Sequence, residues 1–254
     1  MKFILLAAGR GSRLSPITDS QPKCLTPFKT KPIIDYTING LKSINIKEFI
    51  IISGYKSQVL ENHIKSQNIS FKIFTNENYN STNMVYSLFK AREEFDDDLI
   101  ICYSDIIFTP YVLKRIIECK SNFATIIDTD WLSLWNIRME NPLDDVETLK
   151  LDINDNIIEI GLKPKSLNEV EGQFIGLTKV SKSFLPTFIK KYDELETSKA
   201  QNIHFTGFLQ HLLEEKIEIK AVKIHGEWIE IDSIQDLKNY NNSTTILNRL
   251  GLKI

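Results

Sequence analysis

Two glycines, an arginine and a lysine lie close together near the start of the chain, in the segment "AAGRGSRLSPITDSQPKCL". Gly9 and Gly11 let the backbone approach a ligand closely, so that amide groups can point at phosphate oxygens. Ser12 supplies a hydroxyl donor, Arg13 offers a planar fork that matches a phosphate, and Lys23 adds a compact positive charge. From the spacing alone, this segment fits a triphosphate site and a tight strand–helix turn with surface cations equally well.

The loop matches neither of the two best-known phosphate-binding patterns. A dinucleotide-binding loop has a third glycine where this chain has Leu14, and an acidic residue about 20 residues further on, after a second strand. A Walker loop would end in a Gly-Lys-Ser or Gly-Lys-Thr sequence, which is absent. Dinucleotide-dependent oxidoreduction therefore stands as the less favoured alternative.

Two carboxylates follow apolar runs that are typical of buried strands. Asp105 ends "LIICYSD", and Asp232 lies in "EWIEIDSIQDL", preceded by Glu230. Magnesium usually takes one or two protein carboxylates and completes its octahedron with phosphates and water. The alternative interpretation is a loop carboxylate at Asp105 and a helix N-cap at Asp232.

A polar segment, "NENYNSTNMVYSL", precedes a helical pattern. The amides of Asn78 and Asn83 and the hydroxyls of Thr82 and Ser87 can hydrogen-bond a base edge or a ribose. A polar loop before an ordinary helix explains the same residues.

The segment "DTDWLSLWNIRMENPLDDVETLKLD" combines aromatic and charged residues. An aromatic face such as Trp131 can bind an ammonium group, and carboxylates such as Glu147 complement it. Arg138 and Lys150 add positive charges to the same segment. A surface hairpin with packing tryptophans and solvated charges is the alternative.

The elements that would position these groups alternate along the first half of the chain. Apolar runs predict strands over 2–8, 48–54, 70–76 and 97–105, and amphipathic runs predict helices over 31–44, 58–67 and 82–95. This order predicts a mostly parallel sheet with helices on both faces, in which ligands lie at the carboxyl ends of the strands. The glycine loop and Asp105 both fall at that edge.

The second half has more turn signals. Strands are expected over 124–131, 147–164 and 172–181, with a hairpin turn at Asp155–Asn156, and helices over 183–195 and 204–216. A strand, a turn, a strand and a closing helix capped by Asp232 or Ser233 follow over 217–242. We expect a single domain over 1–254 with a β-rich, acceptor-binding insert at about 128–180.

The overall composition is that of a globular protein of 254 residues, 42% hydrophobic and 25% charged. A net charge of −2 does not favour nucleic-acid or membrane binding. Cys24, Cys102 and Cys119 form no CxxC pair, which indicates reduced thiols, and the start "MKFILLAAG" lacks a cleavage site. We therefore expect a cytoplasmic protein without a membrane span, and no catalytic role for its four histidines.

The glycine-rich segment closely resembles the signature LAAGxGxRLxPxTxxxPKxL of nucleotidyltransferases that make activated sugars, choline and phosphonates. The resemblance implies a Rossmann-like α/β fold with a mixed central sheet. It also implies that Arg13 and Lys23 are catalytic, with Mg²⁺ held by Asp105 and Asp232. The residues implied to bind the nucleotide are Leu6, Ala8, Gly9, Gly11, Ser12, Arg13, Lys23, Asn83, Ser87 and Asp105.

The run from Asp130 to Ser181 resembles a subgroup of small-molecule cytidylyltransferases whose acceptors include L-glutamine phosphate and 2-aminoethylphosphonate. The resemblance implies CTP as donor and a small zwitterionic phosphoryl acceptor, first of all L-glutamine phosphate for a capsular phosphoramidate. It implies acceptor contacts from Lys163, at the phosphoryl group, and from Trp131, Arg138, Glu147 and Lys150.

Several alternatives stay open. The acceptor can be 2-aminoethylphosphonate or phosphocholine, or the chain can be a sugar-1-phosphate nucleotidylyltransferase that uses UTP or TTP. A regulatory nucleotide-binding subunit is disfavoured, because such proteins typically lose a loop cation or a metal carboxylate, and this chain keeps both kinds. A homodimer is compatible with the sequence.

Overall fold

A seven-stranded mixed sheet forms the centre of the computed structural model, which describes residues 1–44, 46, 48–241 and 243–252. The strand order is β12-β8-β11-β6-β1-β4-β5, and only β11 among these described strands runs antiparallel to its neighbours. The mixed sheet implied by the resemblance is therefore confirmed. The strands are β1 (Lys2–Ala7), β4 (Glu48–Ser53), β5 (Phe71–Thr75), β6 (Leu99–Tyr103), β8 (Phe123–Asp128), β11 (Gln173–Val180) and β12 (Lys220–Ile224).

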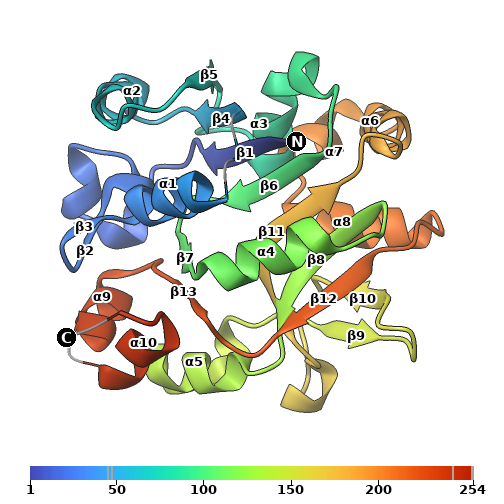
Figure 1. The fold of residues 1–254 in the computed structure, drawn as a ribbon. Coiled ribbons are helices and arrows are strands. Elements are labelled where there is room, and N and C mark those ends of the chain that lie inside the picture. Colours follow the sequence, from blue (N-terminus) through green and yellow to red (C-terminus); the bar gives the residue numbers. More distant parts are fainter. Residues whose placement is uncertain (45, 47, 242, 253–254) are drawn as a thin grey trace.

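Helices cover both faces of this sheet, which explains why its central strands are mostly apolar (Figure 1). Alternate residues of β1 enter two different cores: Phe3 and Leu5 pack on one side, Ile4 and Leu6 on the other. The first core includes α1 (Ile33–Ser43), α2 (Ser57–Ser66), α4 (Pro110–Glu118), α5 (Trp131–Arg138), α9 (Ile234–Asn241) and α10 (Thr244–Arg249). The second includes α3 (Met84–Leu88), α6 (Leu185–Asp193) and α8 (Phe205–Glu214), with α7 (Thr197–Asn202) in contact with α3.

In the described part of the chain, three two-stranded sheets flank the central one. They pair β2 (Pro27–Phe28) with β3 (Lys31–Pro32), β9 (Leu149–Leu151) with β10 (Ile157–Ile160), and β7 (Ile106–Phe108) with β13 (Trp228–Glu230). In the last pair Ile106 lies opposite Glu230, so a segment near the C-terminus is bound next to the end of β6. This pairing builds the candidate active site.

In the second half of the chain, the segment that begins at Trp131 forms the helix α5, so the surface hairpin given as the alternative interpretation is wrong. Both of its tryptophans are buried in the core. Within the β-rich region expected at 128–180, β9 pairs with β10, and β11 joins the central sheet between β8 and β6. The predicted hairpin turn is confirmed, with Asp155 at φ 59° between β9 and β10.

The helix expected over 82–95 is also interrupted. α3 ends at Leu88 and continues as a 3₁₀ segment, Phe89–Glu94, with non-helical angles at Ala91. At its end Glu94 pairs with the buried Lys2 at 2.8 Å, an anchor that the helical periodicity did not indicate.

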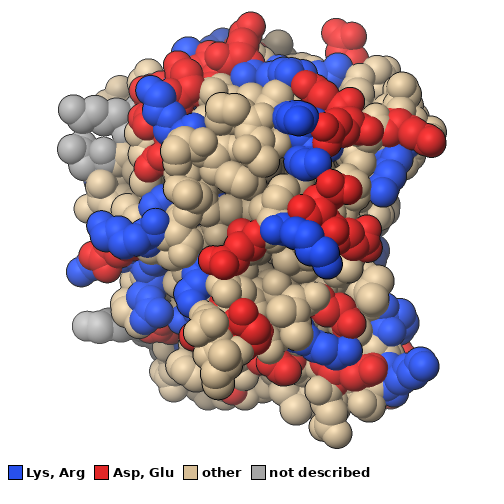
Figure 2. Space-filling view, turned by 90° about the vertical axis from the view of Figure 1, so that its right-hand side faces the viewer, with Lys and Arg blue, Asp and Glu red and all other residues tan. Residues whose placement is uncertain are grey.

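The surface carries both signs of charge. Figure 2 shows one face of the molecule, on which acidic and basic side chains are interspersed without a continuous basic patch. None of the described helices combines the length and apolar character needed to cross the lipid bilayer.

Candidate active site

The glycine loop follows β1 and turns sharply at Gly11, which has left-handed backbone angles (φ 71°, ψ 51°). A Cβ atom at Gly11 would lie 2.7 Å from the Cβ of Lys23, so this position requires glycine for conformation and for space. Thr18 fixes the turn by donating a hydrogen bond from its hydroxyl to the Gly11 carbonyl at 2.9 Å. The loop therefore lets the Lys23 side chain pass directly beside its backbone.

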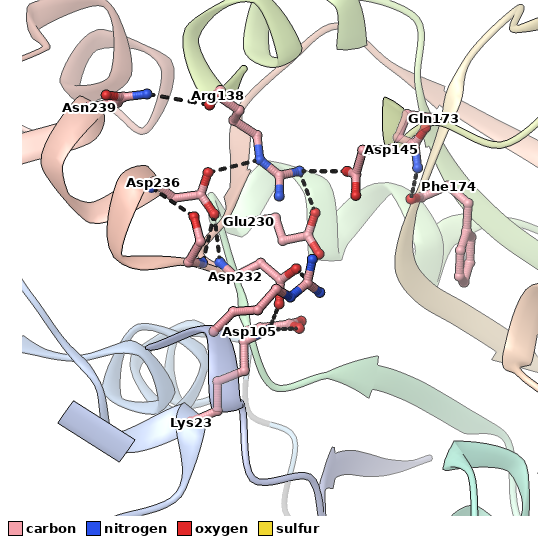
Figure 3. A network of polar contacts seen from close by, with 12 residues as sticks. Lys23, Asp105, Arg138, Asp145, Gln173, Phe174, Glu230, Asp232, Asp236 and Asn239 are labelled. Atoms are coloured by element: carbon pink, nitrogen blue, oxygen red, sulfur yellow. Dashed lines mark hydrogen bonds and ion pairs between the residues drawn. The ribbon is translucent and has the colours of Figure 1, made fainter. Parts of the chain in front are cut away.

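Lys23 reaches a pair of carboxylates from distant parts of the sequence (Figure 3). Its Nζ lies 2.6 Å from Asp105 Oδ2 and also pairs with Asp232, and Arg13 forms a further ion pair with Asp232. The backbone brings the two aspartates together, because the Ile231 amide donates to the Asp105 carbonyl at 2.9 Å. The structure thus gathers all four of these predicted side chains.

A third carboxylate, Glu230, joins this group. Single carboxylate oxygens of Asp105, Glu230 and Asp232 all lie within 4.8 Å of one another. Asp105 Oδ1 is buried and accepts no hydrogen bond from any described residue, so its capacity as an acceptor is unused. Clustered carboxylate oxygens are the donors that Mg²⁺ prefers, and the residues present therefore fit a divalent cation.

Burial and charge act in opposite directions on the cluster. Burial alone would raise the pKa of Asp232, but Lys23 and Arg13 outweigh it and hold that pKa below its ordinary value. Burial alone would lower the pKa of Lys23, but Asp105, Asp232 and Glu230 raise it above the usual range. Burial raises the pKa of Glu230 to about 7, with the neighbouring aspartates adding to the shift and Arg138 opposing it.

Arg138 holds this group from the side opposite Lys23 (Figure 3). Its side chain is only 3% exposed, donates to Glu230 at 2.6 Å and to Asp236 at 3.2 Å, and lies 3.8 Å from Asp145. Because its guanidinium is buried among these three carboxylates, Arg138 lines neither of the cavities described below.

Asp236 links Arg138 to the backbone around Asp232. Its Oδ2 accepts hydrogen bonds from the amides of Asp232 and Ser233, both at 2.9 Å. Ser233 returns the contact, because its Oγ accepts from the Asp236 amide at 3.1 Å. Ser233 is thus the residue that caps α9, and the Asp232 side chain is left to face Lys23.

A cavity of about 290 Å³, here called the loop cavity, opens between the glycine loop and α3. Nine of the ten residues predicted to bind the nucleotide line it, whereas Ser12 is exposed and does not. Tyr79, Thr82, Met84, Tyr103, Ser104 and Asp232 complete the lining, which in full comprises Leu6, Ala8, Gly9, Gly11, Arg13, Lys23, Tyr79, Thr82, Asn83, Met84, Ser87, Tyr103, Ser104, Asp105 and Asp232.

The polar residues of its far wall are interlocked. Asn76 is fully buried and donates to Thr82 Oγ1 at 2.9 Å and to Ser87 Oγ at 2.8 Å. Ser87 donates in turn to the Asn83 carbonyl, and Asn83 caps α3 with its side-chain oxygen. Asn78 does not line the cavity. Hydrogen bonds therefore connect the residues of this wall, and Asn76 is the member that sequence reasoning passed over.

A second cavity of about 270 Å³, here called the side cavity, adjoins the first. The two share Arg13, Met84 and Tyr103. Tyr103 packs over Gly176 (φ 81°), where a Cβ atom would lie 2.4 Å from the ring. The full lining of the side cavity is Arg13, Met84, Tyr103, Ile106, Glu147, Gln173, Phe174, Ile175, His204, Thr206, Trp228 and Glu230.

Of the residues expected to contact an acceptor, the structure places only Glu147 in a cavity. Trp131 is 4% exposed and its indole donates to the Val170 carbonyl, so its ring belongs to the core. Lys150 pairs with Glu159 at 2.9 Å, and Lys163 is exposed and donates to the Leu143 carbonyl. His204, Gln173 and Thr206 line the side cavity instead. No sequence motif had indicated these three residues as part of a site.

The arrangement suits chemistry on a polyphosphate. The loop cavity offers the amides of a glycine turn and two cations, and the carboxylate cluster lies at its junction with the side cavity. A second, smaller molecule in the side cavity would meet the first at this junction. The site can therefore hold two reactants with charge stabilisation between them.

Comparison with known proteins gives a consistent result. A family model described as nucleotidyl transferase matches residues 2–130. The chain is 42% identical over 250 residues to the CTP:phosphoglutamine cytidylyltransferase of Campylobacter jejuni, covering 94% of this chain and 98% of that protein. It is 36% identical over 135 residues to a choline-phosphate cytidylyltransferase of Streptococcus pneumoniae, covering 53% of this chain and 57% of that protein.

The fold is also found among solved structures. The inositol-1-phosphate CTP transferase of T. maritima superposes with a TM-score of 0.78 at 16% sequence identity, over 98% of this chain and 94% of that chain. At this identity, the likeness concerns the fold alone.

Proposed function

The chain belongs to the nucleotidyl transferase family, and on that premise we propose that it transfers CMP from CTP to a small phosphorylated acceptor with release of pyrophosphate. The observation that carries this proposal is the cluster of Arg13, Lys23, Asp105 and Asp232 in the lining of the loop cavity. Our first choice of acceptor is L-glutamine phosphate, supported by the 42% identity to a CTP:phosphoglutamine cytidylyltransferase.

The reaction is an in-line displacement. A phosphoryl oxygen of the acceptor forms a bond to the α-phosphorus of CTP, the bond from that phosphorus to the bridging oxygen breaks, and pyrophosphate leaves. The attacking oxygen is already anionic, so no general base is needed. The protein's contribution is to align the reactants and to neutralise developing negative charge.

The residues of the chain divide this task. The glycine turn at Gly9 and Gly11 presents backbone amides to the triphosphate, and the wall formed by Asn83 and Ser87 lies on the base and ribose side. Lys23 and Arg13 exchange their carboxylate partners for phosphate oxygens and stabilise the departing pyrophosphate. Neither cation requires a large movement, because both already line the loop cavity.

Asp105 and Asp232 would hold a Mg²⁺ ion, with Glu230 beside them. Bound there, Mg²⁺ supplies positive charge to the phosphate oxygens and polarises the α-phosphorus. Arg138 keeps Glu230 and the backbone of Asp232 in place through Asp236.

The setting we propose follows from the acceptor. A CMP-activated phosphoglutamine would supply a phosphoramidate for modification of a capsular polysaccharide. We place the reaction in the cytoplasm, where three unpaired cysteines remain reduced. Residues 128–180, treated as the acceptor-side part of one domain, contribute Glu147 and Gln173 to the side cavity.

A pyrophosphate-release assay tests the proposal. The protein is incubated with Mg²⁺ and CTP, UTP or TTP against L-glutamine phosphate, 2-aminoethylphosphonate, phosphocholine and hexose 1-phosphates. We expect release with CTP and L-glutamine phosphate, abolished in Asp105→Asn. Release only with UTP or TTP and a hexose 1-phosphate would identify a sugar-1-phosphate nucleotidylyltransferase, and no release with any pair would refute nucleotidyl transfer to these acceptors.

A further inference from the structure

Asp128, at the end of β8, is a fully buried carboxylate that lines neither the loop cavity nor the side cavity. Its Oδ1 accepts hydrogen bonds from the amides of Gly226 at 2.7 Å and Asp130 at 2.9 Å. Its Oδ2 accepts one from the indole nitrogen of Trp228 at 2.7 Å and forms an ion pair with Arg249. Each oxygen therefore has two donors, which saturates the carboxylate and fixes its orientation.

Arg249, in α10, is the only cation that the described residues place on Asp128. Its side chain is 8% exposed, and its guanidinium also pairs with Asp130 at 2.9 Å. Its Nε donates to the Trp228 carbonyl at 3.1 Å. A single guanidinium thus holds Trp228 twice, at its backbone directly and at its indole through Asp128.

The turn before β13 is shaped to admit this guanidinium. Gly226 has a φ of 87°, and a Cβ atom there would lie 3.0 Å from Arg249 Cζ, so the position requires glycine for conformation and for space. α10 lies near α5 and β13 at this end of the molecule (Figure 1). The approach of Arg249 is therefore built into the turn that leads to Trp228.

Trp228 begins the short strand that carries carboxylates of the active site. β13 runs over Trp228–Glu230, and Asp232 follows it. Side chains two residues apart on a strand point to the same face, and Trp228 and Glu230 both line the side cavity. β13 pairs only with β7 among the described strands. The anchoring of its first residue therefore bears directly on where the strand lies.

We propose that Arg249 is a positioning residue for the active site, which sets the orientation of Trp228 and the position of β13 from outside both cavities. Without the guanidinium, Asp128 would be a buried carboxylate that lacks a counter-ion, and it would turn toward water or admit it. Either change releases the Trp228 indole and moves the wall that Glu230 shares. The kinetic consequence rests on the proposed function, in which CTP occupies the loop cavity and the acceptor the side cavity.

A purely structural role, in which Arg249 only fastens α10 to the sheet, makes a different prediction. The test therefore compares Arg249→Met and Arg249→Lys with the control Lys2→Met. Lys2 is similarly enclosed, with 6% of its side chain exposed, and pairs with Glu94 at 2.8 Å, but neither residue lines a cavity of the active site. The control thus loses a buried ion pair without a change beside β13.

The first measurement is steady-state pyrophosphate release with Mg²⁺, CTP and L-glutamine phosphate. We expect Arg249→Met to lower kcat/KM for the acceptor about 10- to 100-fold, the range for a misplacement of up to about 1 Å. The KM for CTP should be unchanged, because Asp236 holds the Asp232 amide independently of Arg249. Arg249→Lys should recover part of the loss, since an ammonium restores the charge beside Asp128 but not the planar fork. Lys2→Met should keep wild-type kinetics.

The second measurement is the NMR spectrum of the indole N–H groups in protein labelled with ¹⁵N-tryptophan, without any ligand. The Trp228 indole donates to a carboxylate, whereas the Trp131 indole donates to the Val170 carbonyl at 3.2 Å. Trp228→Phe and Trp131→Phe assign the two signals. We expect Arg249→Met to shift the Trp228 signal and to leave the Trp131 signal in place, and Lys2→Met to shift neither.

Three results would each overturn the proposal: an unshifted Trp228 signal in Arg249→Met, wild-type kinetics in that variant, or an equal kinetic defect in Lys2→Met. If Arg249→Met does not fold, Arg249→Lys decides by the same two measurements, because it keeps the counter-ion of Asp128. The two proposals fail separately. A wild type that releases no pyrophosphate rejects the proposed reaction, and the Trp228 signal still decides whether Arg249 positions this residue.

Discussion

A Lys23→Met substitution removes the ammonium group that bridges Asp105 and Asp232 while keeping a side chain of similar length. The stem of Lys23 packs against Gly11, and methionine retains most of that contact. What is lost is the pairing of Nζ with Asp105 at 2.6 Å and with Asp232. In the metal-free protein, the substitution leaves three clustered carboxylates with less positive charge.

The burial of the partners sets the magnitude. The side chains of Lys23, Asp105 and Asp232 are 12%, 18% and 10% exposed. Removing one partner of a buried charge pair costs about 3–5 kcal/mol of unfolding free energy, whereas an exposed helical pair contributes about 0.3–0.5 kcal/mol. Proton uptake by Glu230, whose pKa is already about 7, offsets part of the loss. We therefore expect Lys23→Met to lose about 2–4 kcal/mol in EDTA near neutral pH.

Divalent cations should reverse this loss. In the wild type, Lys23 occupies the carboxylates that would bind Mg²⁺, so the ion has to displace an existing partner. Without the lysine this competition is absent, and Mg²⁺ should raise the unfolding free energy more in the variant than in the wild type. Turnover should nevertheless fall by about 10²- to 10³-fold, because the variant lacks the positive charge of Lys23 that stabilises the departing pyrophosphate.

Urea unfolding followed by tryptophan fluorescence, in EDTA and in saturating Mg²⁺, measures both effects. Lys65→Met is the matched control, since Lys65 pairs with Glu61 on the exposed face of α2. If Lys23→Met were as stable as Lys65→Met in EDTA, or gained no more from Mg²⁺ than the wild type, the lysine would not be the counter-ion of this cluster.

Three further predictions concern the surroundings of the cluster. Arg138→Met should cost about 3–5 kcal/mol in urea unfolding and lower kcat with little change in the KM for CTP, because it strips Glu230 and Asp236 of their shared cation, and Arg138→Lys should restore part of kcat. Gly176→Ala should destabilise the protein by about 1–3 kcal/mol and raise the KM for both substrates, since the new Cβ displaces Tyr103, and unchanged KM values would contradict the packing argument. In EDTA, stability should fall by up to about 3 kcal/mol as pH rises from about 4.5 to about 7, because the raised pKa of Glu230 makes the folded state hold a proton that the unfolded state releases; Glu230→Gln should flatten that slope, and an unaltered slope would assign it to other groups.

The sequence sufficed for the sheet and for the loop cavity because both depend on local signals. Apolar runs mark the buried strands, and the carboxyl ends of neighbouring parallel strands meet at one edge, so the glycine loop and Asp105 had to be close. Asp232 was placed by a family signature alone. Its true neighbour is set by the pairing of β7 with β13, a contact between short strands that periodicity does not reveal.

The side cavity was harder to predict for a physical reason. A tryptophan next to charges fits a cation-binding surface and a core helix equally well, and Trp131 and Arg138 proved to be buried in α5 and its ion network. His204 and Thr206 come from the start of α8, far along the chain from Glu147, and nothing in their own sequence neighbourhood distinguishes them from ordinary helix residues. Only the closure of the β9–β10 hairpin on α8 makes them neighbours.

Arg13 lies where the two cavities adjoin. Its guanidinium pairs with Asp232, its side chain is 65% exposed, and it lines both cavities. Lys23, by contrast, is nearly enclosed and binds carboxylates 82 and 209 residues away along the chain. A long, exposed side chain can move its charged group from one partner to another, whereas an enclosed side chain keeps its charged group in one place. In the proposed reaction we therefore expect Lys23 to stabilise the departing pyrophosphate from an enclosed position, and Arg13 to stabilise it from the junction of the two cavities.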